Sequence, residues 1–310
     1  MEPNSVSDRD ELAGVTVQSD AVAYGTEPLH RGLDGSKKPR KTGRVNSGIA
    51  TNDLVHSAYQ DNNDAVFPHI LSLYVPPHSR VADVTFGRGV FWKNVDVSQF
   101  EFFPSDLKMD GVPAGCATGI DSRRLPYGDC TLDAVVFDPP YMHTPGGTAH
   151  NGHQNYEAYY ANNAEQDPKV VEQIWIETDG KPPKYHEAVL DLYFRSGREA
   201  CRVLRPGGIY IVKCQDEVCT NRQRLTHLEI TIELEQYGFI VEDLFVVVRT
   251  SKPGVSRLLH RQYHARKNHS YFMVYRKVGG MRPDRGPQLT IGERNAQTAM
   301  TLRERSARQT

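Results

Sequence analysis

The sequence lacks the features of membrane, secreted and disulfide-rich proteins. It has no run of about 18 apolar residues, the length that a membrane-spanning helix needs. Its first residues, MEPNSVSDRDEL, are polar and acidic, unlike a secretory signal. The five cysteines are odd in number and form no CxxC pair, which favours reduced thiols and argues against a structural metal site. We therefore expect a cytoplasmic protein with no bound metal.

An overall excess of charge is also missing, since the formal net charge is only −1. The distribution is nevertheless uneven. Residues 1–30 contain six acids and one base, and residues 31–44 contain six bases and one acid. Residues 251–310 contain thirteen bases and three acids. Because phosphate contacts come from local positive patches, the two basic segments favour a nucleic-acid partner more than the overall neutrality argues against one.

Three regions follow from the patterning. Residues 1–50 are polar and without apolar periodicity, which predicts a flexible arm. Its basic part, residues 31–44, either lies on a phosphate backbone or is a solvated tail, and the sequence favours neither. Residues 51–278 carry the periodic segments of a folded domain, and residues 279–310 form a basic C-terminal tail.

Strands and helices alternate within the domain. Apolar runs predict strands at residues 80–84, 99–106, 132–141, 209–214, 239–250 and 270–277, and amphipathic patterns predict helices at residues 52–75, 186–204 and 224–238. This alternation predicts a doubly wound α/β fold with a mostly parallel sheet and an antiparallel final strand. An insertion, residues 142–185, follows the third strand and is expected to contain a helix around residues 156–175. Long insertions at the carboxyl end of a strand more often have a function than serve only as connections.

Two of the strand ends carry the residues of a nucleotide site. Asp83 ends the first strand, and Gly87 and Gly89 follow in a tight turn, where glycine permits positive φ and close approach to a ligand. Asp106 ends the next strand, at the place where an acid binds ribose hydroxyls in nucleotide-binding folds. The alternative interpretations are an ordinary turn and a surface aspartate.

The tetrapeptide Asp138–Tyr141 (DPPY) is the most informative motif. Its two prolines end the strand in a stiff corner, which fixes a carboxylate, a carbonyl and an aromatic ring in one place. An exocyclic base amine has two N–H donors, which the Asp138 side chain and the Pro139 carbonyl can accept. A base that has left its stack needs a flat partner, here Tyr141. The alternative is a proline-rich turn without a chemical role.

With these motifs the sequence resembles the amino-methyltransferases that modify adenine or cytosine in DNA. The likeness covers residues 52–277 and rests on DVTFGRG (Asp83–Gly89) and on DPPY. It implies a Rossmann-like class I methyltransferase fold and S-adenosylmethionine as cofactor. The implied cofactor-binding residues are Asp83, Thr85, Gly87, Gly89, Asp106 (ribose) and Asp121 (adenine). The implied catalytic residues, which hold the target base, are Asp138, Pro139, Pro140 and Tyr141.

The sequence departs from the family pattern in two ways. Thr85 stands in the slot that is usually aromatic, and Phe86 is shifted by one place. Only 33 residues follow the last predicted strand, too few for a separate recognition domain. Recognition is therefore expected from the insertion, the basic loop 251–269, the tails or a partner subunit. The loop residues expected to bind phosphates are Lys252, Arg257, Arg261, Arg266 and Lys267, although a solvated hairpin is the alternative.

The expected reaction is direct methyl transfer to N6 of adenine in DNA, with the base flipped out of the duplex. An aspartate at the start of the tetrapeptide favours adenine in this family. Three alternatives stay open: an RNA methyltransferase acting on an adenine or guanine amine, a cytosine-N4 DNA methyltransferase, and a catalytically silent nucleic-acid-binding subunit. A homodimer, a specificity partner and a restriction–modification setting are all compatible with the sequence.

Overall fold

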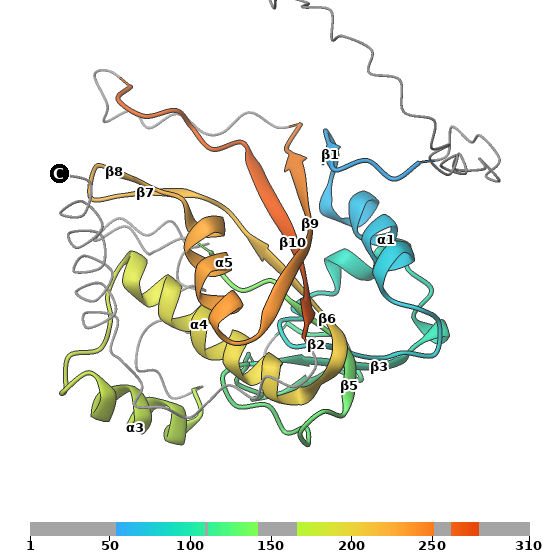
Figure 1. Ribbon diagram of the computed structural model, residues 1–310, viewed down its shortest axis with the longest axis horizontal. Helices are drawn as coiled ribbons and strands as arrows, with labels where there is room; N and C mark the ends of the chain where they lie inside the picture. The colour runs from blue at the N-terminus through green and yellow to red at the C-terminus, as the bar shows by residue number, and fades with distance from the viewer. Residues whose placement is uncertain (1–53, 109–110, 142–165, 251–261, 279–310) are drawn as a thin grey trace, which may run out of the picture. The chain divides into compact units, whose positions relative to one another are not determined.

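The computed structural model describes residues 54–108, 111–141, 166–250 and 262–278 (Figure 1). The strands are β1 (Ala58–Tyr59), β2 (Arg80–Asp83), β3 (Glu101–Asp106), β4 (Ala117–Thr118), β5 (Leu132–Phe137), β6 (Leu204–Cys214), β7 (Glu217–Cys219), β8 (Arg222–Arg224), β9 (Phe239–Val248) and β10 (His269–Lys277). The helices are α1 (Asn63–Tyr74), α3 (Pro168–Glu177), α4 (His186–Val203) and α5 (Thr226–Gln236), with short 3-10 helices η1 (Val90–Asn94) and η2 (Val97–Gln99).

The described strands form one sheet of eight, in the order β1-β9-β10-β6-β5-β2-β3-β4, and a separate β7–β8 hairpin. Neighbours from β4 to β6 pair in parallel, whereas β10 is antiparallel to both β6 and β9. The last described strand, β10, is thus inserted between two strands that run the opposite way. This order, with one reversed strand, is the Rossmann-like class I methyltransferase fold, so the predicted fold class is confirmed.

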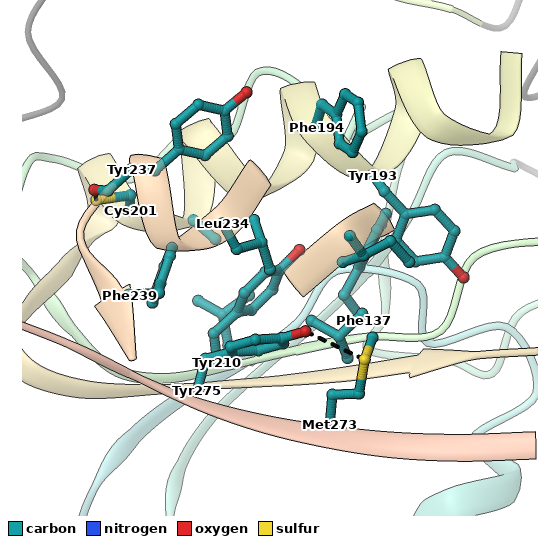
Figure 2. Packing of buried hydrophobic residues seen from close by; sticks show 14 of the residues in the cluster. Phe137, Tyr193, Phe194, Cys201, Tyr210, Leu234, Tyr237, Phe239, Met273 and Tyr275 are labelled. Carbon is teal, nitrogen blue, oxygen red and sulfur yellow. Dashed lines mark hydrogen bonds between the residues drawn. The ribbon is translucent and has the colours of Figure 1, made fainter. Parts of the chain in front are cut away.

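Helices cover both faces of the sheet (Figure 1). Ile209 and Ile211 of β6 pack with α1 and η1, whereas Tyr210, Val212 and Cys214 pack with α4 and α5. Figure 2 shows the second face, where the sheet residues Phe137, Tyr210, Phe239 and Tyr275 pack together with side chains of α4 and α5. Because both faces are buried, the strands read in the sequence as nearly continuous apolar runs.

Several helix and strand boundaries in the structure differ from those predicted. The helix predicted over 52–75 begins only at Asn63, because β1 occupies two of the earlier residues. The strand predicted over 132–141 ends at Phe137, and the strand predicted over 209–214 begins earlier, at Leu204. The short strands β1, β4, β7 and β8 were not predicted, because two or three residues carry no periodic signal.

Some predictions fall outside the described residues. These are the arm 1–50, the tail 279–310 and residues 142–165 of the insertion. Within the rest of the insertion, α3 spans the end of the predicted 156–175 helix. Among the described residues, no helix is long and apolar enough to cross a membrane.

Pro68 lies inside α1 without ending it. A proline has no N–H, so the carbonyl of Asp64, four residues earlier, loses its helical donor. The Asn94 side chain replaces that donor, with its amide nitrogen 3.0 Å from the Asp64 oxygen. The contact joins the first turn of α1 to the end of η1, directly after the glycine turn.

We expect Asn94→Ala to lower the free energy of unfolding by about 1 kcal/mol, because it leaves this carbonyl to solvent. Asn94→Asp keeps the shape of the side chain but loses the donor, so it should lower the free energy of unfolding by a similar amount. In a Pro68→Ala background the helix supplies its own N–H, so the cost of Asn94→Ala should shrink. Urea denaturation of the four variants of this cycle measures the coupling, and equal costs in both backgrounds would refute it.

Candidate active site

Three aspartates lie at one edge of the sheet. Asp83 and Asp106 are the last residues of β2 and β3, and Asp138 directly follows β5. These strands are neighbours in the order β5-β2-β3 and run in parallel. The edge is the carboxyl edge, where α/β folds bind their ligands. The structure therefore brings together the three strand ends that the sequence singled out.

The glycine turn is held against Asp106. The N–H of Gly87, a residue with φ of +53°, donates to Asp106 Oδ2 at 2.8 Å. Gly89 has φ of +67°, and a Cβ there would lie 2.7 Å from Cζ of the Phe86 ring. A side chain at Gly89 would thus meet both backbone strain and a steric clash. Both glycines have the positive φ that the sequence predicted, and at Gly89 the neighbouring ring leaves no room for a side chain.

Asp83 is buried, and both of its carboxylate oxygens accept hydrogen bonds from the protein. Oδ1 accepts from the Thr85 N–H at 3.0 Å, and Oδ2 accepts from the Trp92 indole nitrogen at 2.7 Å. Burial raises the pKa of Asp83 to about 7, although these two hydrogen bonds oppose the rise. Asp83 therefore holds the start of the turn in place through its hydrogen bonds to Thr85 and Trp92. Trp92 was missed by the sequence analysis, since a lone tryptophan in η1 gives no signal of this role.

Thr85 joins the glycine turn to the DPPY corner. Its Oγ1 accepts the backbone N–H of Asp138 at 2.6 Å. A phenylalanine in this slot has no acceptor, so the departure from the family pattern has a structural consequence. Phe86, the displaced aromatic, packs edge-on against Phe102, with ring centroids 5.8 Å apart.

The Asp138 side chain has an unused acceptor. Its Oδ1 is buried and has no hydrogen-bond partner in the described part of the chain. Buried polar atoms are nearly always paired, so this oxygen is a candidate acceptor for a donor that comes from outside the described residues. Burial raises the pKa of Asp138, whereas the positive charges of Lys213 and Arg249 lower it.

The other three residues of the DPPY corner follow Asp138 directly. Pro139 is buried, and Pro140 and Tyr141 are partly exposed. The Tyr141 hydroxyl accepts from Nη2 of Arg249 at 2.8 Å, which fixes the ring relative to the end of β9. Arg249 was not among the predicted site residues, because it precedes the basic loop and no motif marks it.

Asp121 is buried and faces a cation of its own chain. Its carboxylate accepts from the Arg123 guanidinium at 2.9 and 2.7 Å and from the Arg123 N–H at 3.0 Å. A longer contact, 3.4 Å, comes from the N–H of Asp167, which caps α3. Asp121 thus connects the loop before β5 to the start of α3. A contact with a cofactor adenine, as the resemblance implies, requires one of these donors to move.

The predicted phosphate-binding residues are only partly described. Lys252, Arg257 and Arg261 lie outside the described residues. Arg266 is exposed and Lys267 is partly exposed, directly before β10. Nearby, the His264 ring lies 3.2 Å from the Asn221 carbonyl, which connects this segment to the β7–β8 hairpin. In the described part of the chain, no cluster of His, Cys, Asp and Glu side chains is arranged to hold a metal ion.

The raised pKa of Asp83 predicts how stability depends on pH. Because the folded state holds this proton more tightly than the unfolded chain, ionisation of Asp83 costs stability. Relative to Asp83→Asn, the wild-type free energy of unfolding should fall as pH rises from about 4 to 7, by up to about 1.4 kcal/mol per pH unit, and then level off.

Chemical denaturation across this pH range measures the difference. Asp96→Asn is a control, because hydrogen bonds from Ser98 lower the pKa of Asp96, so its contribution to stability should stay nearly constant above about pH 4. A wild-type curve parallel to that of Asp83→Asn from pH 4 to 8 would contradict the prediction.

Comparison with known proteins gives likenesses of fold. No protein-family model and no curated protein matches the chain. Among solved structures, a proposed DNA modification methylase from Thermus thermophilus is 19% identical over 57% of this chain and 56% of its own, with a TM-score of 0.31. TrmN from Thermus thermophilus is 16% identical over 69% of this chain and 49% of its own, with a TM-score of 0.38.

A SAM-dependent methyltransferase from Methanosarcina mazei is 10% identical over 67% of this chain and 97% of its own, with a TM-score of 0.39. The chain thus spans about half the length of the two Thermus proteins. At these identities the likeness concerns the fold alone, and the chemistry has to be argued from this chain's own residues.

Proposed function

We propose that the protein transfers a methyl group from S-adenosylmethionine to the exocyclic amine of a nucleic-acid base, with N6 of adenine in DNA as the target. The observation that carries the proposal is the buried Oδ1 of Asp138, which lacks a donor among the described residues and lies beside the glycine turn. A neutral base amine is a donor of the required kind, since it offers two N–H groups.

The residues of the carboxyl edge fit the proposed cofactor. The turn at Gly87 and Gly89 leaves backbone uncovered by side chains, as a closely approaching ligand needs. In the proposal, Asp106 binds the ribose hydroxyls, Asp83 and Thr85 shape the methionine end, and Asp121 lies at the adenine end. S-adenosylmethionine supplies a methyl group that is already activated as a sulfonium. The protein therefore contributes mainly proximity and orientation.

Asp138 orients the amine. In the proposal, its Oδ1 and the Pro139 carbonyl accept the two N–H groups, which helps to localise the lone pair on the nitrogen instead of in the base ring. The amine gives up one proton on methylation, and the Asp138 carboxylate is in contact with that N–H and receives the proton. Tyr141, held by Arg249, provides the flat surface for the flipped base, and Arg266 and Lys267 contact phosphates.

Asp138→Ala should lower the methylation rate roughly 100-fold or more, because one group that positions a reacting atom is lost. The measurement is nucleoside mass spectrometry after incubation with labelled S-adenosylmethionine and, separately, duplex DNA, single-stranded DNA and total RNA. Asp129→Ala is the matched control, since this exposed carboxylate pairs with Arg202 away from the corner.

Label in N6-methyladenine from DNA, lost in Asp138→Ala alone, supports the proposal. Label in RNA alone would show that the substrate is an RNA amine and not DNA. Label in N4-methylcytosine would show that the target base is cytosine and not adenine. No label on any nucleic acid, despite cofactor binding, would favour a silent binding subunit.

Tyr141 offers a test of base stacking. Tyr141→Ala should lower kcat/KM for the nucleic acid roughly 10- to 100-fold, because stacking of one base on an aromatic ring contributes about 1–3 kcal/mol. Tyr141→Phe keeps the ring and loses only the hydrogen bond from Arg249, so its kcat/KM should stay within a few-fold of the wild type. Similar losses in both variants would show that the hydroxyl matters and that the ring does not stack.

A further inference from the structure

Lys213 is an unusual residue at the carboxyl edge of the sheet. It is the penultimate residue of β6, and it is 1% exposed. Register pairs Phe137 of β5 with Val212 of β6. Continued by one residue, this register places Lys213 beside Asp138. Side chains alternate along a strand, so both residues belong to the face that α1 covers, as Val136 and Ile211 do.

The ammonium of Lys213 has little local compensation. Its Nζ donates to Asn63 Oδ1 at 2.5 Å, at the start of α1. It also lies 3.8 Å from the ring centroid of Phe272 and 6.0 Å from that of Phe91. No carboxylate of a described residue comes within 4.0 Å of it to form a salt bridge.

Burial of an ammonium without an ion pair is costly, so an apolar residue would suit this position better for stability alone. Burial lowers the pKa of Lys213, whereas the nearby Asp138 carboxylate raises it. The two side chains therefore stabilise each other's charged forms across the β5–β6 pair.

The other charged or titratable groups near Asp138 cannot substitute for Lys213. Asp83 has the same sign as Asp138, and Cys214 carries no positive charge. Arg249 is exposed, so its charge is screened by solvent, whereas a buried charge is screened much less. Lys213 is thus the positive charge that acts most strongly on the Asp138 carboxylate.

We propose that Lys213 is a positioning residue for methyl transfer, whose buried ammonium keeps Asp138 ionised as the acceptor of the target amine. The role in methyl transfer rests on the proposed function, whereas the charge coupling of Lys213 and Asp138 does not. A protonated Asp138 would present an O–H donor to the site and could not receive the proton of the amine. The competing explanation is a structural role, in which Lys213 only ties Asn63 to β6.

The test is a direct titration of Asp138. Aspartate carboxyl carbons are labelled with ¹³C, and the Asp138 signal is assigned by its loss in Asp138→Asn. In Lys213→Met the titration midpoint of Asp138 should rise by about one pH unit or more, because removal of the positive charge favours the protonated form. Lys213→Gln, which keeps a donor for Asn63, should give the same rise if Lys213→Met does not fold.

Lys277→Met is the matched control. Lys277 is also buried, but it lies at the end of β10, where its Nζ donates to the carbonyls of Cys201 and Leu204 at 2.6 Å. Because β10 runs antiparallel to β6, this is the opposite edge of the sheet. The same chemical change there should lower stability and leave the Asp138 midpoint unchanged.

The pH dependence of kcat/KM gives the second readout. In Lys213→Met the acidic limb should move to higher pH by the same amount as the midpoint, and in Lys213→Arg, which keeps the charge, it should stay within a few tenths of a pH unit. An unmoved midpoint in folded Lys213→Met or Lys213→Gln would overturn the inference, even if DNA is methylated. A raised midpoint without methylation of any nucleic acid would uphold the charge coupling, while the proposed function and the role of Lys213 in it would fall.

Discussion

The parallel pairing of β5 with β2 on one side and β6 on the other is the constraint on which the candidate site depends. It places Asp138 directly after a strand that is hydrogen-bonded on both edges, so its backbone position is fixed by two neighbours. The Thr85 hydroxyl then accepts its N–H, which joins the glycine turn to the DPPY corner. A displacement of β2 from β5 would separate the two halves of the site.

Buried charge is the second organising feature. Asp83, Asp138 and Lys213 lie at one edge of the sheet, and the pKa of each is shifted by its removal from water. Asp83 is compensated by hydrogen bonds from Trp92 and the Thr85 N–H, whereas Asp138 keeps an oxygen without a donor. The hydrogen bonds of Asp83 are therefore satisfied within the protein, whereas Asp138 keeps an acceptor for the proposed target amine.

The outer parts of the site are also tied to the sheet. Asp121 binds Arg123 and connects to the cap of α3, and Arg249 at the end of β9 holds the Tyr141 hydroxyl. These contacts join four separate chain segments along the carboxyl edge, where the proposed cofactor and base would lie.

The sequence by itself determined the fold class and the central motifs. Strand and helix periodicities predicted the parallel sheet, because buried strands need apolar runs and covering helices need amphipathic ones. DPPY and the glycine turn marked Asp138, Gly87 and Gly89, because prolines and positive-φ glycines have backbone requirements that are local. Short strands such as β1 and β4 could not be predicted, since their existence depends on a neighbour's edge.

Only the tertiary structure decided which side chains surround the motifs. Trp92, Lys213 and Arg249 lie in segments without any motif. The packing of separate elements brings Trp92 to Asp83 and Arg249 to Tyr141 as hydrogen-bond donors, and it brings the charge of Lys213 near Asp138. The resemblance assigns Asp121 to the cofactor adenine, and only the fold shows that its carboxylate accepts hydrogen bonds from Arg123. Charge and hydrogen-bond partnership depend on distance in space, and a single sequence determines that distance only through the completed fold.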